Sequence, residues 1–111
     1  MIGLILALSL SSYADFGYYR ECVNDASAIL HLGYVHTRLV RTDTEPEAWS
    51  RAGANGHRTV YITSSALKSK DHTWLRHTAY HEACHLWLHM KGADYRDEAL
   101  TEMCADALEA N

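Results

Sequence analysis

The stretch HTAYHEACHLWLHMKG, residues 77–92, contains four histidines and one glutamate. His81, Glu82 and His85 within it form an HExxH motif. On a helix, four-residue spacing puts His81 and His85 on one face, close enough for both imidazoles to ligate one zinc ion. Glu82 lies at the flank of that face, where its carboxylate can take a proton from a zinc-bound water that attacks a carbonyl. The spacing therefore predicts a hydrolytic zinc site with Glu82 as general base.

A catalytic zinc also needs a third protein ligand, and the chain offers one downstream. Residues 102–106 read EMCAD, an ExxAD pattern. On a helix Glu102 and Asp106 share one face, so Glu102 can complete a His–His–Glu set while Asp106 accepts the free ring N–H of a ligand histidine. Glu98, one turn earlier, is the alternative third ligand. His89 lies too far along the helix axis to bind the same ion as both HExxH histidines.

HExxH followed by ExxAD on the next helix resembles the gluzincin metallopeptidases, and the short chain is similar to the single-domain minigluzincins. The resemblance covers about residues 58–109. It implies a peptidase in which His81, His85 and Glu102 bind one zinc ion. Glu82 would then be the general base and Asp106 the hydrogen-bond partner of a ligand histidine, His81.

The same resemblance implies how substrate binds. The strand expected at residues 58–63 would form the upper rim of the cleft and pair with a peptide or protein substrate in extended form. Gluzincins usually carry a side chain that stabilises the oxyanion. Tyr95, between the two ligand helices, is the first candidate, and Arg96, His89 and His57 are alternatives.

The elements that must position these residues can be read from local patterns. Apolar residues at helical spacing predict a helix in residues 21–33, which Gly33 would end. Residues 34–42 and 58–63 read as strands, and Asn55-Gly56 before the second is typical of a hairpin turn. A small, mostly antiparallel sheet of about three strands follows from this pattern.

Two further helices are expected after the sheet. Asp71 is a suitable N-cap for a long active-site helix that runs to about Met90, with Gly92 in the C-terminal turn. A last helix, carrying the glutamates, is expected at about residues 97–109. The order of elements predicts an α+β, zincin-like domain.

Composition limits the other possibilities. The chain has 111 residues and a net charge of −4, enough for one small domain and without a basic run. We therefore expect no nucleic-acid partner, and the sequence indicates no oligomeric state. Residues 1–14 combine a short apolar run with small residues at a possible cleavage site, typical of a signal peptide. The run is too short for a stable membrane span, which leaves residues 15–111 as the metallopeptidase domain.

A signal peptide predicts a secreted or periplasmic protein; if the apolar run is instead a buried element, the protein is cytoplasmic. Cys22, Cys84 and Cys104 could then form one bridge, and the sequence leaves the pairing open. The remaining histidines show no partners in sequence and are expected at the surface: His31, His36, His72 and His77.

Three other functions remain open at this point. The chain could be a non-catalytic or regulatory binding domain on a zincin scaffold, although a structural zinc needs no general base. It could be a cytosolic zincin that cleaves a single protein partner. It could also carry a histidine-rich helix that binds no metal.

Overall fold

The computed structural model describes residues 2–41 and 46–110, with side chains described from Ala14 onward. In this part of the chain four helices and three strands form the predicted α+β fold. The helices are α1 (Ile2–Ile29), α2 (Ser64–Ser69), α3 (His72–Met90) and α4 (Glu98–Glu109). The strands are β1 (His36–Val40), β2 (Ala48–Ala52) and β3 (Arg58–Thr63). The sequence did not predict α2, because six residues are too few to show a helical period.

The sheet is mixed, with the strand order β1-β3-β2. β2 and β3 form the predicted antiparallel hairpin, and Gly56 in its turn has a φ of 83°, a conformation that favours glycine. β1 pairs with β3 in parallel. We expected a mostly antiparallel sheet; the difference arises because β1 lies beside β3 and not beside β2. The order also leaves β2 at an edge of the sheet.

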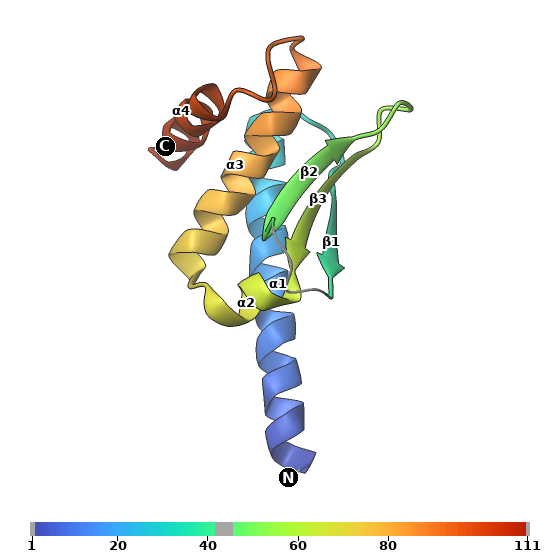
Figure 1. The fold of residues 1–111 in the computed structure, drawn as a ribbon, viewed down its shortest axis with the longest axis vertical. Coiled ribbons are helices and arrows are strands. Elements are labelled where there is room, and N and C mark those ends of the chain that lie inside the picture. The colour runs from blue at the N-terminus through green and yellow to red at the C-terminus, as the bar shows by residue number, and fades with distance from the viewer. Residues whose placement is uncertain (1, 42–45, 111) are drawn as a thin grey trace.

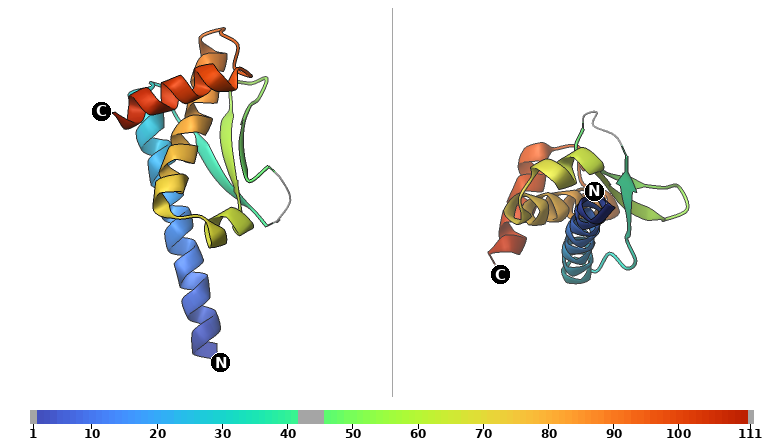
Figure 2. Two further views of the ribbon diagram at one scale, coloured as in Figure 1. Left: turned by 60° about the vertical axis from the view of Figure 1, so that its left-hand side comes forward. Right: turned by 90° about the horizontal axis from the view of Figure 1, so that it is seen from below.

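α3 is the central helix of the fold, as Figures 1 and 2 show. It packs against α1, against α4 and against the edge strand β2. Its predicted ends are confirmed: the Asp71 side chain accepts a hydrogen bond from the Trp74 backbone N–H at 2.9 Å, and Gly92 has a φ of 72°. The HExxH segment therefore lies on a helix held from several sides.

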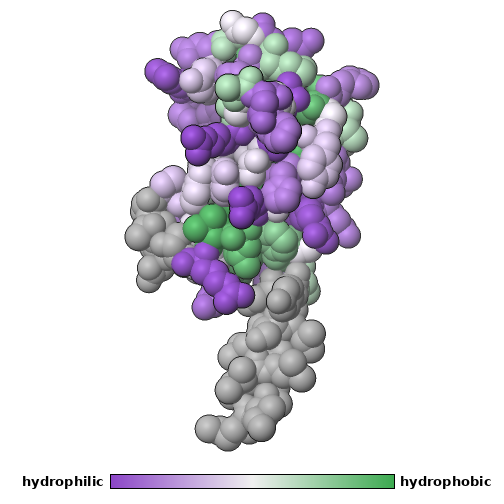
Figure 3. Space-filling model, turned by 90° about the vertical axis from the view of Figure 1, so that its right-hand side faces the viewer, coloured by the Kyte–Doolittle hydropathy of each residue, from purple (hydrophilic) through white to green (hydrophobic). Residues whose placement is uncertain are grey.

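The core lies between α1, α3 and the sheet. Its fully buried side chains include Tyr19 and Val23 from α1, Leu75 from α3 and Ile62 from β3. The side of the molecule that carries the sheet is mainly hydrophilic, with hydrophobic surface in a few places (Figure 3). Among the described residues, no helix combines the length and apolar character that crossing a membrane requires.

Of the predicted signal peptide, residues 1–14, the part from residue 2 onward lies in the start of α1. Apart from Ala14, its side chains lie outside those that the structure describes, so the signal peptide stays a prediction.

Candidate metal centre

The two HExxH histidines meet on one face of α3. Because they are one helical turn apart, their rings lie with centroids 4.7 Å apart and their Nε2 atoms face each other at 3.1 Å. Both side chains are 15% exposed. The helix thus brings two largely buried imidazole nitrogens to one point, as the spacing predicted.

Glu98 supplies a third donor group at that point. One carboxylate oxygen lies 2.9 Å from His81 Nε2, and the other lies 3.1 Å from His85 Nε2. Glu98 is the first residue of α4, and the Asp97 side chain caps this helix by accepting from the Leu100 N–H at 3.0 Å. The cap fixes where α4 begins, and so places the first carboxylate of the helix opposite the two histidines.

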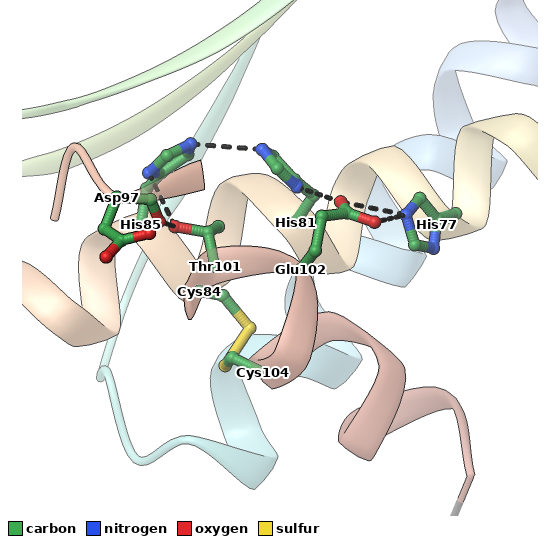
Figure 4. The surroundings of a disulfide bond; sticks show 8 residues. All are labelled: His77, His81, Cys84, His85, Asp97, Thr101, Glu102 and Cys104. Atoms are coloured by element: carbon green, nitrogen blue, oxygen red, sulfur yellow. Dashed lines mark hydrogen bonds and ion pairs between the residues drawn. A yellow bond between two sulfur atoms is a disulfide. The ribbon is translucent and has the colours of Figure 1, made fainter. Parts of the chain in front are cut away.

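The remaining ring nitrogens are held from outside this group (Figure 4). His85 Nδ1 lies 2.6 Å from the backbone carbonyl oxygen of Tyr95, and His81 Nδ1 contacts the carboxylate of Glu102. A carbonyl oxygen only accepts, so His85 Nδ1 carries the proton. Partial burial raises the pKa of Glu102, but hydrogen bonds from His81 and His77 outweigh it and lower that pKa. The ionised carboxylate likewise accepts from His81 Nδ1–H.

In a neutral imidazole whose Nδ1 is protonated, Nε2 presents a lone pair, so both Nε2 atoms can act as acceptors. The two imidazole Nε2 atoms and the two oxygens of Glu98 then form a group of acceptors, all close together. Such a group repels itself unless a cation lies among its members, either a metal ion or extra protons on the imidazoles. Ligand atoms of a tetrahedral zinc, each bound at about 2.1 Å, lie about 3.4 Å apart, so the observed separations need only a small expansion. The donor set fits zinc.

The glutamate that the structure places beside both HExxH histidines is not the one that the sequence favoured. His81, His85 and Glu98 form one possible ion-binding group, whereas Glu102 groups with His81 and His77. Glu102 thus lies beside His81, where Asp106 was expected. Asp106 itself is exposed and lies near His77 and Glu109. Glu98 and Glu102 contact the two histidines in the arrangement that was expected of Glu102 and Asp106, one helical turn earlier on α4.

Glu82 lies beside the histidines and is almost buried, with 7% of its surface exposed. Burial raises its pKa to about 7; the positive potential of His85 and a hydrogen bond from Ser50 oppose this shift, and Glu98 adds to it. A carboxylate with a pKa near neutrality can both accept and release a proton at physiological pH. Its place in the HExxH motif and its environment agree with the predicted role of general base, which stays a prediction.

A cleft of about 520 Å³ opens over these groups. Its floor includes His81, Glu82 and His85, and Trp49 and Ser50 of the edge strand β2 line one side. Of the two strands of the hairpin, the resemblance pointed to residues 58–63 as the rim. That expectation was wrong, because β3 is paired on both sides and β2 lies at the edge.

Tyr95 lines the cleft together with Arg96. Its ring stands edge-on to His89, with centroids 5.1 Å apart, while its backbone carbonyl holds His85. The structure therefore shows a positioning contact by the Tyr95 backbone, and the role of its side chain at an oxyanion stays a prediction. His57 lies in the hairpin turn and is not among the residues that line this cleft.

A disulfide resolves the cysteine pairing that the sequence left open. Cys84 of α3 is bonded to Cys104 of α4, and Cys22 is free and buried. The bond joins the two helices that carry the histidines and Glu98.

No protein-family model matches the chain, and no curated protein and no solved structure matches it either.

Proposed function

We propose that this protein is a zinc-dependent peptidase of the small gluzincin type. The observation that carries the proposal is the group of acceptor atoms formed by His81, His85 and Glu98. In this proposal these three residues hold one zinc ion, with Glu98 in place of Glu102 as third ligand. Zinc bound there supplies a Lewis acid that polarises a carbonyl group and makes water a nucleophile at neutral pH.

Glu82 is the general base in this scheme. It takes a proton from the attacking water and later gives it to the leaving amine. Its burial supports this role, because a carboxylate shielded from solvent keeps the proton until the leaving group needs it. The hydroxyl of Ser50 supports the ionised form, in which Glu82 starts and ends the cycle.

The edge strand β2 is the proposed binding surface for substrate. Among the described residues, β2 pairs with β3 on one side only, and its residues line the cleft beside His81. A peptide in extended form can add to this edge through main-chain hydrogen bonds, which bring a peptide carbonyl towards the histidines. Binding of this kind depends on the backbone of the substrate more than on its side chains. We therefore propose broad peptide specificity.

We also propose that the protein is exported, to the periplasm or the medium. The Cys84–Cys104 bond supports this placement, since disulfides persist in oxidising compartments and are rare in the cytosol. The apolar run predicted as a signal peptide points the same way.

The proposal is tested by metal content and peptide cleavage in the same preparations. We expect close to one zinc per chain by elemental analysis, and cleavage of a mixed peptide library detected by mass spectrometry. The matched variant Glu82→Gln keeps the size of the side chain but cannot act as a base. It should retain zinc and lose about 100- to 10,000-fold in cleavage rate.

Three results would contradict the proposal. Folded protein that neither contains zinc nor takes it up would show that the histidines carry extra protons instead of a metal. Glu82→Gln that binds zinc and cleaves at the wild-type rate would remove Glu82 from the mechanism. Zinc binding without any cleavage by the wild type would favour a binding domain on a zincin scaffold.

A further inference from the structure

His77 lies one turn before His81 on α3 and contacts two carboxylates of α4. Its Nε2 lies 2.9 Å from one oxygen of Glu102 and 3.1 Å from the other, and its Nδ1 lies 3.0 Å from Glu109. The side chain is 33% exposed, less than that of Glu102 at 45%. The sequence showed no partner for this residue and predicted a surface histidine.

These contacts connect His77 to the candidate metal centre. Glu102 contacts His81 Nδ1 and His77 Nε2 at the same time, so imidazole and carboxylate groups alternate from His81 to Glu102, His77 and Glu109 (Figure 4 shows the first three). The members of the series come alternately from α3 and α4. Every contact in it is between a ring nitrogen and a carboxylate oxygen.

We infer that His77 is a positioning residue for the metal centre: it holds the Glu102 carboxylate on His81 Nδ1, which directs the Nε2 lone pair of His81 at the ion. This inference rests on the proposed function and extends it to a residue outside the ligand set. The physical reason is the exposure of Glu102. A half-exposed glutamate has several rotamers open to it, and one hydrogen bond to His81 competes with water. A second bond, from His77, restricts the carboxylate to the side of His81.

Glu109 has the same relation to His77 that Glu102 has to His81. Its carboxylate at Nδ1 orients the His77 ring so that Nε2 faces Glu102. Partial burial lowers the pKa of His77, but hydrogen bonds and charge from Glu102 and Glu109 outweigh it and raise that pKa, in keeping with a ring that donates from both nitrogens.

The test is the zinc affinity of the full chain, measured by competition with a chromophoric chelator. His77→Leu removes both hydrogen bonds and keeps a side chain of similar bulk. We expect it to bind zinc about 10-fold more weakly, at the low end of the effect of residues that orient metal ligands. His77→Gln can still donate from an amide nitrogen to Glu102, so its affinity should stay within about 3-fold of wild type.

His72→Leu is the matched control. His72 is on the same helix and also contacts a carboxylate, Asp15 at 3.0 Å, but this pair links α3 to α1. Its loss should leave zinc affinity unchanged. A second readout is the ¹⁵N–¹H signal of His81 Nδ1–H in the zinc-bound protein: its exchange with solvent should be faster in His77→Leu and unchanged in His72→Leu.

The outcomes separate this inference from the proposed function. If the wild type binds no zinc, the proposed function fails, and the inference fails with it. If the wild type binds zinc and folded His77→Leu binds it equally well, only the inference is overturned. A second zinc equivalent that disappears in His77→Leu would also overturn it, because His77 would then be a ligand, in the group that it forms with Asp106 and Glu109.

Discussion

Cys84 and Cys104 join α3 to α4, the two helices of the candidate site, by a disulfide bond. Cys84 immediately precedes His85 on α3, and Cys104 follows Glu102 by two residues on α4. The bond therefore closes a loop that contains the whole connection between the HExxH motif and the carboxylates. It limits how far α4 can move from α3, and so helps to keep Glu98 opposite the histidines.

Removal of this disulfide should weaken both stability and metal binding. For the double variant Cys84→Ala/Cys104→Ala we expect a loss of about 3 kcal/mol, because the unfolded chain regains the freedom of the closed loop. This corresponds to a drop in Tm of roughly 10 °C. Zinc affinity should fall as well, since α4 is less restrained. Thermal unfolding followed by circular dichroism and the chelator competition assay measure the two effects.

The buried free cysteine provides a control for the loss of sulfur from the core. Cys22→Ala removes a buried thiol and no covalent bond, so its zinc affinity should match that of the wild type. Equal zinc affinity in the double variant would show that packing alone holds the two helices in place.

If Glu98 is the third ligand, alanine substitutions of the acidic residues of α4 should reduce zinc affinity to different extents. Glu98→Ala should reduce zinc affinity by more than about 100-fold, because it removes a ligand. Glu102→Ala should cost about 10- to 100-fold, the usual effect of removing the partner of a ligand histidine. Asp106→Ala should have little effect. A larger loss in Glu102→Ala than in Glu98→Ala would restore the assignment that the ExxAD pattern favoured.

Metal removal should lower the thermal stability of the wild type. An ion that binds only the folded state stabilises it by about 2.7 kcal/mol when free zinc is 100 times the Kd. Chelation should therefore lower Tm by roughly 10 °C. The Tm of Glu98→Ala should not respond to the chelator, which separates loss of the specific ion from general effects of the reagent. An unchanged Tm in the wild type would count against a tight site.

The N-cap of α3 offers a prediction that does not depend on metal. The Asp71 carboxylate accepts from the Trp74 N–H, and Asp71→Ala leaves this N–H without its partner. We expect a loss of about 1 kcal/mol in the free energy of unfolding, measured in urea. Asp71→Ser retains a capping oxygen and should recover most of the loss. Equal stability of the Ala and Ser variants would show that solvent replaces the cap without cost.

Local patterns in the sequence were sufficient for α3, α4, the β2–β3 hairpin and the first half of the site, but not for α2 or the full length of α1. The Asp71 cap, the Asn55-Gly56 turn and the four-residue spacing of His81 and His85 each depend on residues close together in the chain. For this reason the α+β fold, the long helix α3 and the approach of the two imidazoles could all be predicted. The mixed pairing of the sheet could not, because the neighbour of β1 is set by contacts between distant segments.

The second half of the site was decided by how α3 and α4 pack. Glu98 and Glu102 are four residues apart, and so are Glu102 and Asp106, so helical spacing alone fits either pair to the histidines. The tertiary structure determines which of the two pairs faces the histidines. The short connection, the Asp97 cap and the disulfide together set which turn of α4 lies opposite His81. The contacts of His77 arise in the same way. Spacing within a helix determines which side chains share a face, and only the packing of two helices determines which faces meet.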